Sequence, residues 1–166
     1  MSHLHKFSLA MLFVCAWHAA VAKPASEEIA CPSVTANGNP GSVAEALTRV
    51  ADKTEALVRV RVEHQAPGSE IYLLMRVELD SKTGLRNLDT LSRSPNDPKL
   101  IETSYNELAA HVAFATKVVE GFLHGDANLL LKRTDDSSAI GMLQDLSCGI
   151  KALSQNIHEL GEHLGE

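Results

Sequence analysis

The chain is poor in the residues that bind nucleic acid or lipid surfaces. Aromatic residues make up 4% of the sequence, and 15 Lys and Arg stand against 21 Asp and Glu, for a formal net charge of −6. Nucleic acids and anionic membranes attract basic patches, whereas Arg59, Arg61 and Arg76 are scattered along their segment. After residue 22, no apolar run approaches the length of a transmembrane helix, about eighteen residues. We therefore expect no nucleic-acid partner and no stable membrane insertion.

Signatures of catalysis are missing as well. The chain has no glycine-rich phosphate loop, no nucleophile elbow and no context that would activate a cysteine. The nearest candidate for a metal site is His158 and His163, with Glu159 between them. A zinc-protease helix needs its two histidines four residues apart, on one face. These are five apart and point about 140° away from each other. The sequence therefore predicts no enzyme, no metal site and no cofactor.

What the chain does have is the heptad spacing of helices that lie along one another. The last two of three such stretches are joined by a short connection, which predicts an antiparallel pair within an all-α, four-helix-bundle-like domain. The seam residues are Val43, Leu47, Val50, Thr54 and Leu57, then Ile101, Tyr105, Leu108, Val112, Ala115, Val119 and Phe122, and finally Leu143, Leu146, Ile150, Leu153, Ile157, Leu160 and Leu164.

The first helix has a clear start and an ambiguous end. Ser42 and Glu45 match a capping box, and we expect a helix from there to about Gln65. Residues 58–62 alternate between apolar and charged side chains, which is typical of a half-buried strand. A short β-hairpin over residues 57–80 therefore stays open as the alternative.

The remaining boundaries follow from breakers and caps. Residues 83–95 are expected to form an irregular crossover. The pair Asp97-Pro98 restarts a helix, because Asp caps the N-terminus and Pro fits the first helical position. That helix runs to about His124, and residues 129–131 are expected to pack against the end of the bundle. The final helix spans 137–164, with N-cap oxygens supplied by Asp135, Asp136, Ser137 and Ser138.

The N-terminal region predicts secretion and one disulfide bond. Residues 1–22 are typical of a signal peptide, with Lys6 before an apolar run and an Ala-x-Ala cleavage site. Cys15 leaves with it, and an oxidising compartment favours a bond between Cys31 and Cys148. A free thiol pair or an intermolecular bridge stays open. Cys148 occupies an outward heptad position, within reach of a flexible arm over residues 23–41, and the bundle domain spans 42–166.

Two features of the sequence resemble one known family. The first is a helix that runs into a Gln-x-x-Gly turn over Leu57–Gly68, and the second is a helix followed by an apolar link over Lys99–Leu131. This family is the interleukin-6 and interleukin-12 superfamily of helical cytokines, most nearly its leukaemia inhibitory factor branch. Cys31 and Cys148 resemble that branch's tie from an arm to a later helix. The resemblance implies a secreted ligand of a transmembrane cytokine-type receptor. It also implies an up-and-down or up-up-down-down bundle with a long first crossover, in which Gly68–Lys82 forms a short fourth helix or one helix is missing.

Two functions compete. In the first, a monomeric secreted ligand binds its receptor through the polar side of the last helix, at Lys151, Gln155, His158 and Glu162, although these four residues can equally be merely solvated. In the second, the protein is a secreted helical carrier of a lipid or other apolar ligand. The broad apolar face of residues 99–124 favours a carrier, and the scarcity of aromatic and basic interfacial residues argues against it.

Overall fold

The part of the chain that the structure describes forms an all-α bundle of four helices. In a computed structural model, which describes residues 29–33, 35–93 and 96–164, these are α1 (Pro40–Glu63), α2 (Gly68–Arg93), α3 (Pro98–His124) and α4 (Ser137–Leu164). The expected all-α class is confirmed, and in the described part of the chain the β-structure is limited to an isolated bridge between Asp126 and Leu131. The predicted signal peptide, residues 1–22, lies outside the described residues.

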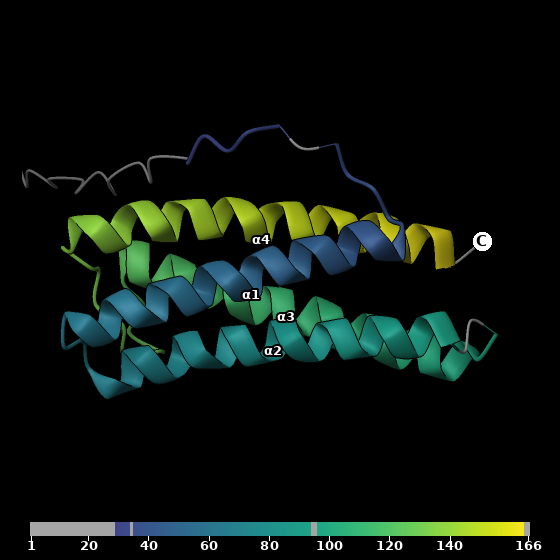
Figure 1. Cartoon of the computed structure of the whole chain (residues 1–166), viewed down its shortest axis with the longest axis horizontal. Helices are drawn as coiled ribbons and strands as arrows, with labels where there is room; N and C mark the ends of the chain where they lie inside the picture. The colour runs from purple at the N-terminus through teal and green to yellow at the C-terminus, as the bar shows by residue number, and fades with distance from the viewer. Residues whose placement is uncertain (1–28, 34, 94–95, 165–166) are drawn as a thin grey trace, which may run out of the picture.

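The helices run alternately up and down, and each packs against two neighbours (Figure 1). α1 contacts α2 and α4, and α3 contacts the same two helices. Of the two topologies expected, up-and-down is therefore the one that the chain adopts. The long first crossover is wrong, because residues 83–95 are for the most part the second half of α2. The hairpin alternative over 57–80 is also wrong, since the chain reverses at His64–Pro67 between two helices.

Of the two alternatives for Gly68–Lys82, the fourth helix is the one that is present, as α2, but it continues to Arg93. Its full length was not predicted because small residues interrupt its apolar seam. The buried positions of α2 recur at heptad spacing, but two of them are Ser81 and Gly84. A Cβ on Gly84 would lie 3.0 Å from Leu108 and 3.1 Å from Leu47, so this glycine marks a close approach of α2 to α1 and α3 and not a helix end. The full set of buried residues in α2 is Leu74, Val77, Ser81, Gly84, Leu88 and Leu91.

The three predicted seams do form the core. All five seam residues of α1 are buried, as are the seam of α3 from Leu108 onward and that of α4 from Leu143 to Leu160. Ile101 and Tyr105 are partly buried, and Leu164 is 37% exposed because α4 ends there. A contiguous cluster of leucine, isoleucine and valine side chains, with Phe122, thus holds the four helices together.

The helix starts agree with the sequence in two cases of three. Asp97 caps α3 by accepting from the N–H groups of Lys99 and Leu100 at 3.1 Å each, and Asp136 caps α4 in the same way. The capping box at Ser42 is wrong. α1 already begins at Pro40, and the side chain of Asn39 accepts from the Ser42 N–H at 2.8 Å. Pro40 fits the first turn because no intrahelical partner awaits its missing N–H there.

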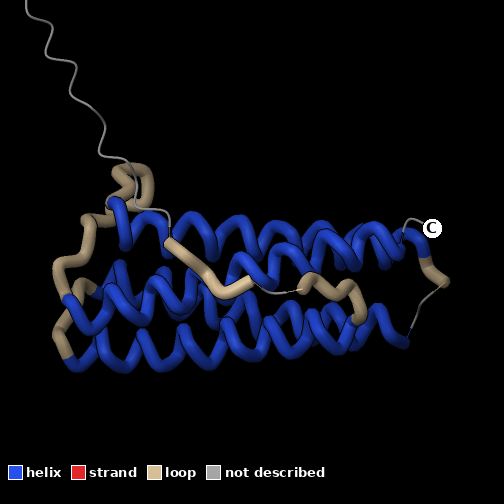
Figure 2. The backbone as a smooth tube through the Cα atoms, turned by 90° about the horizontal axis from the view of Figure 1, so that it is seen from above, coloured by secondary structure: helices blue, strands red, loops and turns tan. Residues whose placement is uncertain are grey.

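The N-terminal arm is fastened to the outer side of α4 (Figures 1 and 2). The expected disulfide between Cys31 and Cys148 is present, with the two Cα atoms 5.3 Å apart. A second attachment follows at Asn156, whose Oδ1 accepts from the Asn37 N–H at 3.0 Å. The Asn156 side chain is buried, and its amide also approaches the carbonyl of Ser42 at 3.5 Å. One amide therefore joins α4 to both the arm and the start of α1.

Candidate functional site

An apolar stripe on α2 is exposed to solvent. Tyr72, Met75 and Leu79 are 62%, 53% and 59% exposed, and their spacing of three and four residues places them on one side of the helix. They line a shallow groove of about 620 Å³ together with charged residues of the same helix. We call Tyr72, Met75 and Leu79 the α2 stripe.

Charged side chains are held in place beside the α2 stripe. The guanidinium of Arg76 lies 5.1 Å from the ring centroid of Phe114 on α3, a cation–π contact, and its Nε lies 3.8 Å from Asp80. Asp80 in turn lies 3.8 Å from Nδ1 of His111 on α3. Arg76 is thereby oriented from two sides next to the apolar residues.

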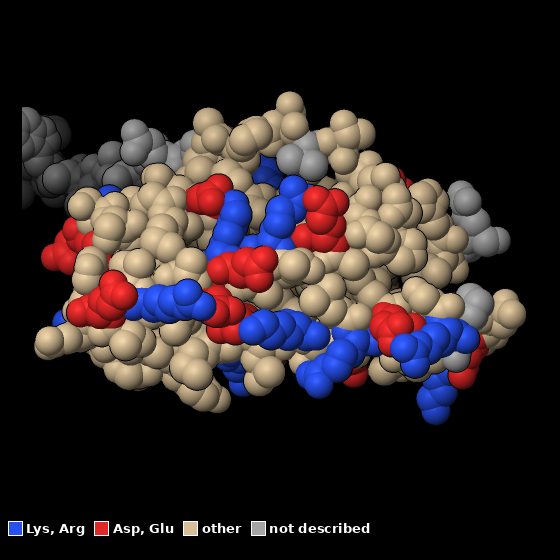
Figure 3. Space-filling model, viewed as in Figure 1, with Lys and Arg blue, Asp and Glu red and all other residues tan. Residues whose placement is uncertain are grey.

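The α1 and α2 face shown in Figure 1 has a different character. Lys or Arg and Asp or Glu alternate along both helices there (Figure 3). Lys82 pairs with Glu78 and lies 3.8 Å from Glu55, and the hydrogen bond that its Nζ donates to Glu78 is the main reason why the pKa of Lys82 is raised. Glu55 also pairs with Arg59. Such exposed pairs contribute little stability each, and they leave this face well solvated.

The four residues predicted on α4 share one exposed face. Lys151, Gln155, His158 and Glu162 are all exposed, and His158 Nε2 lies 3.5 Å from Glu162. They border the junction of α3 and α4, where Lys151 and Gln155 line a groove beside Cys31. The structure thus brings them together as a surface, and their role in receptor binding stays a prediction.

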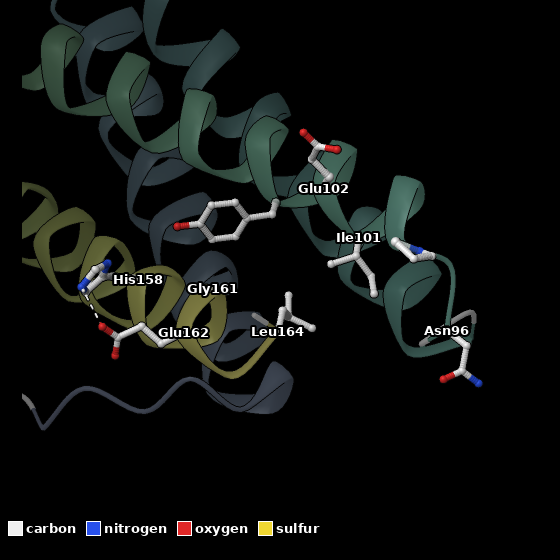
Figure 4. A pocket seen from close by; sticks show the side chains of 9 residues that line it. Asn96, Ile101, Glu102, His158, Gly161, Glu162 and Leu164 are labelled. Atoms are coloured by element: carbon white, nitrogen blue, oxygen red, sulfur yellow. Dashed lines mark ion pairs between the residues drawn. The ribbon is translucent and has the colours of Figure 1, made fainter. Parts of the chain in front are cut away.

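An open cleft lies between the start of α3 and the end of α4 (Figure 4). Its volume is about 560 Å³. Ile101 from α3 and Leu164 from α4 extend into the space between the two helices, while Glu102 and Glu162 stand on opposite sides of it (Figure 4). We call this space the α3–α4 cleft. Its lining residues are Asn96, Pro98, Ile101, Glu102, Tyr105, His158, Gly161, Glu162 and Leu164.

A charged cluster closes the opposite end of the bundle. Arg61 at the end of α1 pairs with Glu70 of α2 at 2.6 Å and with Asp136 at 3.3 Å, and His64 Nδ1 lies 2.7 Å from the same Asp136 oxygen. Hydrogen bonds from Ser138 and then His64 hold the pKa of Asp136 well below its usual range. The cluster fastens α1, α2 and the N-cap of α4 to one another, so its role is structural.

The loop between α3 and α4 displays one leucine to solvent. Asp126 and Leu131 exchange backbone hydrogen bonds at 2.9 Å, which makes the loop tight. Leu131 is buried and Leu129 packs on the core, as expected. For Leu130 the expectation is wrong, because its side chain is 84% exposed and its φ is +55°. A left-handed conformation is unfavourable for a leucine.

The sequence reading missed the α2 stripe, and its only signal was weak. Tyr72, Met75 and Leu79 repeat at helical spacing beside the buried Leu74 and Val77. The positions of α1 and α3 decide which of the two adjacent apolar stripes of α2 faces the core. The sequence of α2 alone does not determine those positions. Among the described residues, no helix is long and apolar enough to span a bilayer, and no group of three or more His, Cys, Asp or Glu side chains is placed to hold a metal.

Comparison of the chain with known proteins gives no match. No protein-family model, no curated protein and no solved structure matches it. Function therefore has to be argued from the surfaces described above.

Proposed function

We propose that this protein is a secreted helical ligand that acts by binding a transmembrane receptor, and that the α2 stripe is its main contact surface. The observation that carries the proposal is the exposure of Tyr72, Met75 and Leu79 by more than half on one helix face. Because each is a little more than half exposed, each of these side chains gives up about half of the ~1.5–3 kcal/mol that full burial of a large apolar side chain provides. A partner that covers them recovers this free energy.

The composition of this surface supports a protein partner. Tyr, Met and Arg are enriched in protein interfaces, and Tyr and Arg dominate binding hot spots. Tyr72 and Met75 stand in the α2 stripe, and Arg76, held by Phe114 and Asp80, stands beside it. Because the stripe lies on a helix of a packed bundle, little conformational entropy is lost when a partner binds.

The resemblance to helical cytokines supports the class of function and not the receptor sites. Cytokine bundles use long crossovers to run two helices up and two down, whereas this chain joins α1 to α2 and α2 to α3 by short turns. The predicted signal peptide and the Cys31–Cys148 bond support secretion, since disulfides persist in oxidising compartments. We take the ligand to be a monomer.

The test compares two helix faces on the same oxidised, secreted protein. A panel of receptor ectodomains is screened by surface plasmon resonance. The variant Tyr72→Ser/Met75→Ser is then compared with Lys151→Ser/Gln155→Ser on α4. We expect the first variant to weaken binding at least tenfold and the second to change it little, because truncating buried anchors costs about 2 kcal/mol or more.

Two other outcomes would contradict the proposal. If only the α4 variant loses binding, the receptor face is the one predicted on α4 and the α2 stripe is rejected. If the unmodified protein binds no ectodomain and no responsive cell, the receptor proposal fails. Circular dichroism of each variant shows whether the bundle is retained, which we expect because all four residues are exposed.

A second candidate function, carriage of a small apolar ligand, is favoured by the α3–α4 cleft. Its volume of about 560 Å³ falls in the range of small-molecule sites. This function needs no receptor, and equilibrium binding of small molecules to the purified protein tests it directly.

A further inference from the structure

We propose that the α3–α4 cleft binds a small amphipathic cation, namely a protonated amine attached to an aromatic or alkyl body. This inference deepens the carrier function, on which it rests, and is independent of receptor binding by α2. The cleft stands at the end of the bundle where α3 begins and α4 ends, and α2 residues do not line it.

The walls of the cleft suit an apolar body. Ile101 and Tyr105 from α3 meet Gly161 and Leu164 from α4, and Pro98 adds to the same surface. Ile101 and Leu164 extend into the space between the helices (Figure 4). Ligand sites are commonly apolar with a few polar groups that fix orientation, and this cleft has that composition.

The charge at the cleft selects the head group. Glu102 lines it from α3 and Glu162 lines it from α4 (Figure 4). Among the described lining residues the one basic side chain is His158, and it already lies 3.5 Å from Glu162. The two carboxylates border the cleft from opposite sides, so their combined field attracts an ammonium group between the helices and repels a carboxylate or phosphate head. The net charge of −6 acts in the same direction.

The aromatic ring of Tyr105 is seated on the backbone of α4. A Cβ on Gly161 would lie 2.6 Å and 2.8 Å from ring carbons of Tyr105, so only glycine at this position lets the ring lie against the helix. Tyr105 in this position forms one wall of the cleft.

Isothermal titration calorimetry with three probes of similar shape tests the inference. The probes are 2-phenylethylamine, neutral 2-phenylethanol and anionic 3-phenylpropionate. We expect the amine to bind at least tenfold more tightly than the other two. Glu102→Gln and Glu162→Gln should each weaken the amine several-fold, with little effect on the alcohol. Glu63→Gln is the matched control, because it removes the same charge from an exposed site at the end of α1.

The results distinguish binding of apolar ligands in general from a preference for amines. If the three probes bind equally well, an apolar carrier survives and the preference for amines is overturned. If Glu63→Gln weakens the amine as much as Glu162→Gln does, the attraction belongs to the overall charge and the cleft is rejected as its source. If the amine does not bind, the inference falls. In no case is receptor binding through the α2 stripe affected.

Discussion

Replacing Gly38 by alanine should loosen the N-terminal arm from α4. A Cβ at this position would lie 2.6 Å from the carbonyl oxygen of Glu159 and 2.6 Å from the backbone nitrogen of Leu160. Contacts below 3.0 Å force a shift, and here both neighbours are helix backbone, which cannot give way as a flexible side chain can. The arm must therefore lift off.

The cost follows from what the arm would leave behind. Lifting the arm breaks the hydrogen bond from the Asn37 N–H to Asn156, whose side chain is in the buried class. A buried polar group that loses its partner costs about 1–3 kcal/mol. Alanine recovers about 0.4–1 kcal/mol by restricting the unfolded chain. We expect Gly38→Ala to lower the free energy of unfolding by about 1–2 kcal/mol.

Urea unfolding of the oxidised protein, followed by circular dichroism, measures this change. Gly141→Ala is the control, because its Cβ meets nothing within 4 Å and the residue lies inside α4. That variant should gain about 0.5–1 kcal/mol from helix propensity alone. If Gly38→Ala is as stable as Gly141→Ala, the close seating of the arm on α4 is refuted.

Three further predictions concern stability. Replacing Cys31 and Cys148 together by alanine should lower the free energy of unfolding by about 4–5 kcal/mol, since the bond closes a loop of 117 residues; a loss below about 1 kcal/mol would contradict the chain-entropy argument. Leu130→Asn should stabilise by about 0.5–1 kcal/mol, because Asn tolerates a positive φ and an exposed leucine is removed; thermal unfolding decides the sign. Asp136→Asn should destabilise at neutral pH. Because the folded pKa of Asp136 is depressed, its contribution is complete above the ordinary value of 3.8 and is lost as the pH falls below it. The urea midpoints of the unmodified protein and of Asp136→Asn, measured between pH 7 and 2.5, should therefore approach each other in acid. A difference between the two midpoints that stays constant would argue against a stabilising role of the Asp136 charge.

The bounds of a helix could be predicted from the sequence where its local apolar pattern agrees with the packing of the bundle. α3 and α4 have unbroken apolar seams and a clear cap or start, so their bounds were predicted to within a residue or so. With Cys15 assigned to the signal peptide, Cys31 and Cys148 were the two cysteines left, and the outward position of Cys148 was compatible with the bond that the structure shows. α2 shows the opposite case, since Ser81 and Gly84 occupy seam positions that only the nearby Leu47 and Leu108 explain.

The candidate sites were less predictable for a related reason. Exposure of the α4 face could be predicted because polar residues alternate with a strong seam. The α2 stripe consists of side chains that are as apolar as a core, and only the positions of α1 and α3 leave Tyr72 and Met75 uncovered. The α3–α4 cleft joins residues about sixty positions apart in sequence, such as Ile101 and Gly161. No local sequence pattern predicts that residues so far apart in the chain line the same cleft.

The disulfide of the arm also reports whether the four helices have packed completely. Since α1 is the first helix and α4 the last, their packing closes the ring of helices, after neighbours in sequence can already have paired as hairpins. Cys31 precedes α1 and is held beside Cys148 by that closure. Thiol oxidation thus locks molecules whose ring is complete, and a thiol-reactive label would mark those in which the ring has not closed.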